Sequence, residues 1–197
     1  NYFLPQLKFG SWEKQYFAGI KSPKRRLSWL ASRYLLKQVL GTDQFVELLF
    51  DAYGKPYLGN YNMKISLSHT DNYAAAIVSA HHDVGIDVEE SLRDIRVIRN
   101  KFLSETEIKQ LSSPESNTEL MLYWSAKEVI YKIYGKRKLE FKEDMFIKPF
   151  TMGHTGSMKG LLLKNGAVSQ YHLHYLVKPA FLLVFGTDTE VDIISIA

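Results

Sequence analysis

The sequence VGIDVE, at residues 84–89, has the alternating pattern of a β-strand with two different faces. Side chains two positions apart in a strand lie on the same face. Asp87 and Glu89 are therefore expected to point to one side, and Ile86 and Val88 into a core. Two carboxylates placed in this way are candidate ligands for a hard divalent cation.

A second informative sequence, WSAKEVIYK at residues 124–132, predicts part of an α-helix. Glu128 and Lys132 are four positions apart in it and would share a helix face. Asp87, Glu89 and Glu128, brought together with Lys132, would hold a divalent cation and the phosphate that it binds. The two sequences together predict phosphate chemistry assisted by magnesium.

The composition limits the class of protein. The chain has 197 residues, of which 46% are hydrophobic, so it can bury the core of one domain or of two small ones. It contains no cysteine, which excludes disulfides, thiolate catalysis and cysteine-ligated metals and fits a cytoplasmic protein. It has no long apolar run and no basic-then-apolar leader, so neither a membrane span nor a retained signal peptide is expected. The net charge of +4 favours an anionic partner.

The first half predicts a basic helix followed by short strands. Ser22 and Pro23 are typical of a helix start, and Gly41 of a helix end. The helix is expected to run from Pro23 to Leu40. Strands are expected at residues 46–50, 65–67 and 73–79, with a turn at residues 53–56.

The second half predicts three helices and then a sheet. Ser104 with Glu107, and Ser116 with Glu119, match capping boxes, the second opening a long helix that ends at Gly135. A further helix is expected at residues 93–101, strands at residues 157–163, 171–177, 181–185 and 191–196, and a hairpin turn at Asn165 and Gly166. Each half thus combines helices with a small, largely antiparallel sheet, which predicts an α+β fold of two lobes of similar size.

Several segments occur in the order found in the 4′-phosphopantetheinyl transferase superfamily, and the chain resembles that family over about residues 20–150. The GIDVE strand matches the family's Gly-Ile-Asp-x-Glu, and WSAKEVIYK matches Trp-x-x-Lys-Glu-x-x-x-Lys. Upstream, SHT at residues 68–70 resembles Ser-His-Ser, with Thr70 keeping a hydroxyl. GKP at residues 54–56, an arginine-bearing helix at residues 25–37 and FLSETE at residues 102–107 also match.

The resemblance is closest to the larger, monomeric type that activates surfactin-like synthetases. It implies a pseudo-dimer of two similar small α+β lobes with the active site between them. Residues 1–82 would form the N-terminal lobe, which binds coenzyme A, and residues 83–197 the C-terminal lobe with the metal-binding strand and helix. Such proteins begin with an extra strand, for which residues 2–7 are the candidate if that edge is not missing.

The implied reaction moves the 4′-phosphopantetheine of coenzyme A to a serine of an apo acyl or peptidyl carrier protein and releases adenosine 3′,5′-bisphosphate. Asp87, Glu89 and Glu128 would bind Mg²⁺, with Mn²⁺ left open. Glu128 could also take the serine proton, and Lys132 would place a positive charge on the phosphates. Lys127 points elsewhere on helical spacing.

The resemblance also implies the coenzyme A contacts. Lys55, Ser68 and His69 match positions that contact its phosphates and nucleotide. Arg33 would reach the 3′-phosphate together with one residue of the cluster Lys24, Arg25 and Arg26. Arg25 is taken as the candidate, although the sequence does not decide among the three. The carrier is expected to be acidic. The spacing of Arg93, Arg96 and Arg99 places them near one helix face, which is either a docking surface for this carrier or an ordinary solvated basic face.

Other interpretations start from the same residues. The acidic strand could be a solvated edge, and Glu128 with Lys132 an ordinary surface ion pair. A non-catalytic module of the same fold that binds coenzyme A or a carrier protein is the alternative function. Nucleic-acid binding is not expected, because aromatic residues do not alternate with the basic cluster. His172 and His174 share a strand face, but no third zinc ligand is placed.

Overall fold

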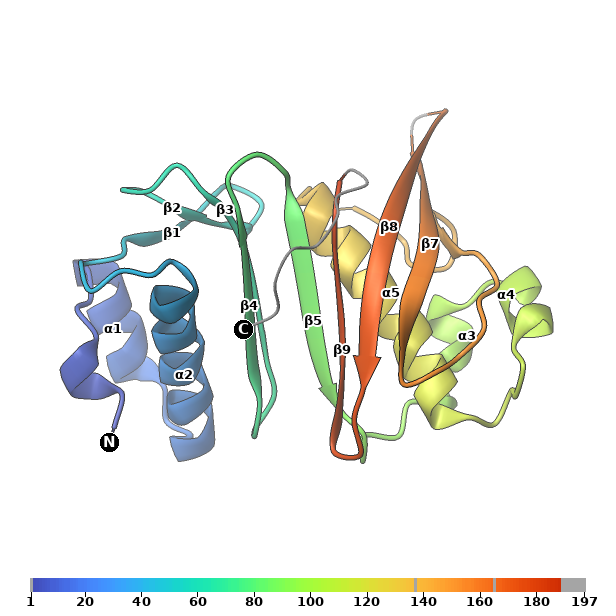
Figure 1. Cartoon of the computed structure of the whole chain (residues 1–197), viewed down its shortest axis with the longest axis horizontal. Coiled ribbons are helices and arrows are strands. Elements are labelled where there is room, and N and C mark those ends of the chain that lie inside the picture. Colours follow the sequence, from blue (N-terminus) through green and yellow to red (C-terminus); the bar gives the residue numbers. More distant parts are fainter. Residues whose placement is uncertain (1, 137, 165, 189–197) are drawn as a thin grey trace.

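The computed structural model describes residues 2–136, 138–164 and 166–188, and it has the predicted α+β fold (Figure 1). The chain begins with a short 3₁₀ turn and two helices, followed by two small hairpins. The second half has a five-stranded sheet and one long helix that crosses it. The elements before β5 are η1 (Leu4–Gln6), α1 (Ser11–Gly19), α2 (Pro23–Val39), β1 (Leu48–Phe50), β2 (Pro56–Leu58), β3 (Lys64–His69) and β4 (Ala74–Ser79).

All the strand pairs of the described residues are antiparallel. β1 pairs with β2, β3 pairs with β4, and the larger sheet has the order β5-β9-β8-β7-β6. The carboxylate strand is therefore an edge strand of the larger sheet. Its strands are β5 (Val84–Glu90), β6 (Met145–Ile147), β7 (Thr155–Lys164), β8 (Ala167–Val177) and β9 (Phe181–Thr187).

The main hydrophobic core lies between the larger sheet and α5 (Asn117–Tyr134), which packs against all five strands of that sheet. Leu120, Ala126 and Val129 of the helix are fully buried against the sheet, as are Leu173 and Val184 of the strands. Three short helical elements follow β5 in the sequence and precede α5. They contribute buried residues such as Phe102 to this core. They are η2 (Arg96–Ile98), α3 (Arg99–Phe102) and α4 (Glu105–Gln110).

Serine hydroxyls join β3 to β5 in place of a backbone ladder. The Ile86 amide donates to Ser66 Oγ at 3.2 Å, and the Val88 amide donates to Ser68 Oγ at 3.2 Å. The hydroxyls thus satisfy edge amides that would otherwise be buried without acceptors. Figure 1 shows the β3–β4 hairpin beside β5, with α2 on its far side.

The hydrophobic residues of β5 lie where the alternation predicts. Ile86 and Val88 pack with Ala75 of β4 and Phe185 of β9. The other face of β5 is turned toward α5. The prediction that the acidic and apolar side chains of this strand separate onto two faces is therefore confirmed.

The basic helix begins and ends as predicted. Ser22 Oγ accepts a hydrogen bond from the Arg25 amide, and Gly41 has a φ of +61°, a left-handed conformation that glycine adopts without strain. The N-terminal expectation is wrong, because residues 2–7 form no strand and contain the 3₁₀ turn η1. Helix α1 was not predicted; its mixture of aromatic, charged and small residues has a weak helical period.

Two predictions in the second half need correction. The helix expected at residues 93–101 is replaced by η2 and α3, because the Asp94 carboxylate accepts the Arg96 amide and starts a new turn there. Ser116 caps α5 through the Glu119 amide, but the Glu119 carboxylate accepts the amides of Ser112 and Ser113, so the capping box is not reciprocal.

Most other elements agree with the sequence, but strand β2 was not predicted, since only a turn was expected up to Pro56. The capping box of Ser104 and Glu107 is present, and α5 ends at Gly135 in the left-handed conformation. Strand β6 was missed, since three residues give too short a pattern. The expected strand at residues 191–196 and Asn165 of the expected turn lie outside the described residues, and the lobe boundary at residue 82 stays a prediction. No helix among the described residues is long and apolar enough to cross a membrane.

Candidate active site

A glycine lets the carboxylate strand approach the long helix. A Cβ atom at Gly85 would lie 2.5 Å from the Val129 carbonyl oxygen of α5, closer than side chains tolerate. Asp87 and Glu89 follow at alternate positions on the same face of β5, so they also turn toward α5. The glycine of the GIDVE sequence is thus a condition for bringing these carboxylates to Glu128 and Lys132.

Of the three carboxylates of the candidate site, Asp87 is the least exposed to solvent. Its Oδ1 accepts from Ser68 Oγ at 3.0 Å and from Lys132 Nζ at 2.8 Å. Its Oδ2 is buried and has no hydrogen-bond partner. A buried carboxylate oxygen without a donor is costly, so this atom is suited to receive a ligand.

Lys132 connects α5 to the edge of β5. Besides Asp87, its ammonium donates to the Ile86 carbonyl oxygen at 2.8 Å, and the side chain keeps a quarter of its surface exposed. The predicted position of Lys132 beside the acidic strand is therefore seen. Its remaining proton and its exposed part are available to an anionic ligand.

Glu89 is held by two partners that the sequence did not predict. The Arg93 guanidinium pairs with it, and Trp124 Nε1 donates to its Oε1 at 3.1 Å. Arg93 also lies 5.5 Å from the centre of the Trp124 ring. Burial raises the pKa of Glu89, and the bond to Arg93 opposes that rise. Trp124 is thus both a core residue and a fixed donor to this carboxylate.

Glu128 is held in an environment that favours a proton on it. Its pKa is raised to about 7, first by burial and next by the negative charge of Asp87. Glu89 also raises it, whereas the positive charges of Lys132 and Arg93 lower it. Glu128 therefore lies within electrostatic reach of the predicted residues on β5. A carboxyl group with a pKa near neutrality can either give or accept a proton in the physiological range.

A cationic region adjoins these carboxylates at the end of β3. His69 is exposed there, next to Ser68. Partial burial lowers the pKa of His69, and the positive charges of Arg33, Arg25 and Lys132 lower it as well. The predicted nucleotide contacts on α2 and β3 therefore lie within electrostatic reach of one another.

Arg33 and Lys55 have partners within the protein. Arg33 Nε donates to Glu13 at 3.3 Å, and its guanidinium lies 3.7 Å from the centre of the Trp29 ring. Burial lowers the pKa of Arg33 to about 10. Lys55 Nζ donates to Asp83 Oδ1 and to the carbonyl oxygen of Ile133, both at 2.9 Å. Their contacts to coenzyme A stay predictions.

Lys127 points away from the site, as helical spacing predicts. It is fully buried and forms an ion pair of 2.8 Å with Glu107. It also donates to three backbone carbonyls, those of Phe102, Phe141 and Met145, at 2.7–2.9 Å. Its role is to fix α5 against α3, α4 and β6.

Among the described residues, no group of three or more His, Cys, Asp or Glu side chains is arranged to hold a metal ion. Lys132 forms an ion pair with Asp87, and Arg93 forms one with Glu89, so cations of the protein occupy two of the three predicted metal ligands. Sequence reasoning missed Ser66 as a neighbour of the site, and it did not predict that Trp124 and Arg93 bind Glu89. Only the position of Trp124 in the helix sequence, four residues before Glu128, carried a signal.

A family model described as the 4′-phosphopantetheinyl transferase superfamily matches residues 83–184. The 4′-phosphopantetheinyl transferase HetI of Nostoc sp. is 28% identical over 127 residues, which are 57% of this chain and 54% of that protein. The 4′-phosphopantetheinyl transferases AcpT of Salmonella typhi and Salmonella typhimurium are 29% identical over 117 residues, which are 56% of this chain and 60% of each relative. The chain thus matches little more than half the length of these relatives.

Proposed function

Because the chain belongs to the 4′-phosphopantetheinyl transferase superfamily, we propose that it transfers the 4′-phosphopantetheine of coenzyme A to a serine of an apo acyl or peptidyl carrier protein. The by-product would be adenosine 3′,5′-bisphosphate. The observation that carries the proposal is the cluster of Asp87, Glu89 and Glu128 with Lys132, which the contact at Gly85 makes possible. Phosphoryl-group transfer needs charge stabilisation and positioning, and these residues offer both.

We infer that Asp87, Glu89 and Glu128 hold a Mg²⁺ ion or, alternatively, Mn²⁺, after their side chains move together from the present arrangement, in which Lys132 and Arg93 pair with Asp87 and Glu89. Carboxylate oxygens are the ligands that such hard cations prefer. The unpartnered Oδ2 of Asp87 supports this inference, because a buried carboxylate oxygen without a donor can accept a metal ion. The raised pKa of Glu128 supports it as well, because burial and the charge of Asp87 disfavour its ionised form and a cation would stabilise that form. A bound ion would neutralise the diphosphate of coenzyme A and orient it for displacement.

The side chains of the protein have separate tasks in this proposal. Glu128, ionised when the ion is bound, accepts the proton of the attacking serine hydroxyl, directly or through a water molecule. Lys132 supplies positive charge to the phosphate oxygens, and its bond to the Ile86 carbonyl keeps it at the strand. Ser68 orients Asp87 through its hydroxyl. Arg25 and Arg33 provide the positive potential that draws the nucleotide end of coenzyme A, and His69 beside them offers it a hydrogen-bonding group.

The proposed protein partner is an acidic carrier, bound by a monomer in the cytoplasm. The single basic helix face expected for docking does not form. Arg96 pairs with Asp94 and Arg99 with Glu115, so their charges are partly compensated. Leu92 and Val97, in contrast, are almost fully exposed close behind Glu89. We therefore expect apolar contacts to contribute to carrier docking along this segment as well as charge.

The test is a reaction of the protein with coenzyme A, Mg²⁺ and an apo carrier. The expected result is an increase in carrier mass by one phosphopantetheine, with an equal amount of adenosine 3′,5′-bisphosphate released. A carrier whose acceptor serine is replaced by alanine is the control, and a chelator should stop the reaction. Tight binding of coenzyme A with no change in carrier mass would instead favour the non-catalytic binding module.

A further inference from the structure

The tip of the β3–β4 hairpin is bound to the end of β5 by a carboxylate that the proposed mechanism does not use. Glu90, the last residue of β5, continues the face of Ile86 and Val88, which is turned toward β4. The Asn72 side-chain amide donates to Glu90 Oε2 at 3.0 Å, and the Asn72 backbone amide donates to Oε1 at 3.2 Å. Asn72 belongs to the turn at residues 70–73, which joins β3 to β4. One carboxylate thus holds this turn at two points, and we call the contact the Glu90 clamp.

The turn is itself braced by Thr70. The Thr70 hydroxyl accepts from the amides of Asn72 at 3.2 Å and Tyr73 at 3.1 Å, and the Thr70 amide donates to the Tyr73 carbonyl at 2.8 Å. A hydroxyl that bonds amides two and three residues ahead fixes a tight turn. Hydrogen bonds from Thr70 and then from Asn72 lower the pKa of Glu90, so they favour its ionised form. The turn and Glu90 therefore form one hydrogen-bonded unit, in which the hydroxyl of the SHT sequence has a task.

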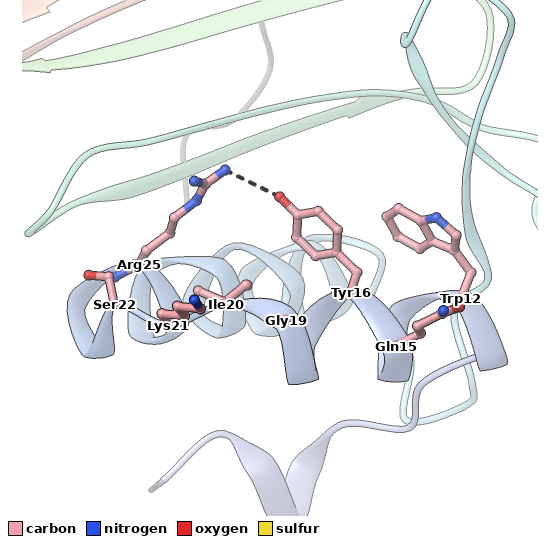
Figure 2. A pocket seen from close by; sticks show the side chains of 8 residues that line it. All are labelled: Trp12, Gln15, Tyr16, Gly19, Ile20, Lys21, Ser22 and Arg25. Atoms are coloured by element: carbon pink, nitrogen blue, oxygen red, sulfur yellow. Dashed lines mark hydrogen bonds between the residues drawn. The ribbon is translucent and has the colours of Figure 1, made fainter.

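The other side of the turn reaches the start of α2. Lys24 pairs with Asp71 at 3.6 Å, but both side chains are largely exposed, so this ion pair adds little stability. The start of α2 is in turn attached to α1. Figure 2, drawn at the pocket that these two helices line, shows Arg25 and Tyr16 pointing toward one another, with Arg25 Nη2 donating to the Tyr16 hydroxyl at 3.3 Å. The Glu90 clamp is thus the firmer of the two polar attachments of the turn.

The clamp lies directly beside two residues of the candidate active site. His69 precedes the turn, and Glu89 precedes Glu90, so a movement of the turn relative to β5 changes the separation of His69 from Glu89. Serine hydroxyls join β3 to β5 in place of a backbone ladder, and such a contact fixes the register of two strands less firmly than a ladder does. Tyr73 packs on Phe181 of β9 with ring centroids 4.7 Å apart, an apolar contact with little directionality. Directional support for the turn therefore comes from Glu90.

We propose that Glu90 is a positioning residue, which keeps His69 at the separation from Glu89 that the bound diphosphate of coenzyme A requires. It acts through the turn at residues 70–73 and has no contact with the reacting atoms. The inference rests on the proposed function and adds to it a residue that sets the geometry between the two halves of the chain.

Variants of Glu90 in the transfer assay test the inference. Glu90→Ala should lower kcat/KM for coenzyme A about tenfold, since misplacement by 1 Å at a distance from the chemistry costs up to about a hundredfold. Glu90→Gln removes the charge and keeps one carbonyl oxygen as an acceptor for Asn72, so it should recover most of the loss. Asn72→Ala should resemble Glu90→Ala, and the double variant should be no worse than either single variant, because both remove one contact.

Asp144 supplies the matched control. Its carboxylate accepts from Lys164 Nζ at 2.6 Å and from the Glu140 amide at 2.8 Å, so it also supports a local turn, but within the second half of the chain. Asp144→Ala should leave kcat/KM unchanged. Thermal unfolding of each variant measures the effect on the fold itself. Equal kcat/KM in Glu90→Ala and wild type, an equal loss in Asp144→Ala, or an equal loss in Glu90→Gln would overturn the inference.

The position of His69 is read independently of transfer by the NMR signals of its ring, assigned with His69→Gln. These signals should move in Glu90→Ala and stay in place in Glu90→Gln and Asp144→Ala. Normal transfer by the wild type, with no change of transfer or of the His69 signals in Glu90→Ala, would reject only the clamp. A wild type that transfers nothing, but whose His69 signals move in Glu90→Ala alone, would reject the proposed function and keep the clamp as a device that places His69.

Discussion

The Ser68 hydroxyl donates a hydrogen bond of 3.0 Å to Asp87 Oδ1 and accepts one of 3.2 Å from the Val88 amide. A single side chain of β3 therefore satisfies the edge of β5 and orients its central carboxylate. The neighbouring Ser66 accepts the Ile86 amide, and its hydroxyl donates no hydrogen bond to Asp87. Both serines accept an amide of β5, but Ser68 also orients Asp87. Comparing the two residues therefore distinguishes support of the strand from support of the carboxylate.

Replacing Ser68 by alanine should lower both stability and transfer. Loss of the acceptor leaves the Val88 amide unsatisfied, at a cost of about 1–3 kcal/mol in the free energy of unfolding. Asp87 also loses a donor that orients it, so the rate of transfer should fall. Ser66→Ala is the matched control, with a similar loss of stability and normal transfer. Urea unfolding and transfer assays of both variants check this; equal transfer by both would contradict the role of Ser68.

Lys127 should matter for folding and not for substrate binding. Lys127→Met leaves Glu107 as an unpaired buried charge, which should lower the free energy of unfolding by about 3–5 kcal/mol. Lys109→Met, on the exposed side of α4, should change it by less than about 0.5 kcal/mol. Urea unfolding measures both values. If Lys127→Met were as stable as the wild type, the buried network would not fix α5 as described.

Arg25 and Arg33 should respond differently to loss of the 3′-phosphate from coenzyme A. Arg25→Ala is expected to bind coenzyme A and dephospho-coenzyme A with similar affinity, because the phosphate has lost its partner. Arg33→Ala should still discriminate between them and should lose about 3 kcal/mol of stability, since buried Glu13 is left unpaired. Titration of both ligands decides the assignment. If only Arg33→Ala bound coenzyme A and dephospho-coenzyme A with similar affinity, Arg33 and not Arg25 would be the 3′-phosphate contact.

Binding of Mg²⁺ should release a proton from Glu128. Its pKa of about 7 means that about half of the metal-free protein carries this proton at pH 7, whereas the carboxylate must be ionised to bind an ion. Mg²⁺ affinity should therefore rise with pH between about 6 and 8 and level off above that range. Calorimetry in buffers of different ionisation enthalpy counts the released protons. Glu128→Gln should release none from this position, and a wild type that releases none at pH 7 would contradict the assignment.

The local part of the fold follows from the sequence. Helix α2, strand β5 and helix α5 were predicted because each has a clear period and a capping or stop residue, such as Ser22 and Gly135. The pairing of Asp87 and Glu89 on one face needs only the period of a strand. The same is true of Glu128 and Lys132 on a helix.

The interactions between distant segments could not be predicted in the same way. No pattern places the Ser66 and Ser68 hydroxyls against β5, since that contact depends on how two sheets meet. Helical spacing alone predicted a helix at residues 93–101. In the structure, Arg93 pairs instead with Glu89, and the Asp94 carboxylate accepts the Arg96 amide, so a continuous helix does not form there. Tertiary contacts outweigh local propensity in such short segments.

The most direct test of the account is the mass of an apo carrier after reaction with coenzyme A, Mg²⁺ and each of three proteins. These are the wild type, Asp87→Asn and Glu128→Gln, compared at equal concentration and with thermal unfolding as the measure of folding. The account predicts one added phosphopantetheine with the wild type and none with either variant, because both changes remove charge from the proposed metal site. Transfer by both folded variants at the wild-type rate would contradict it.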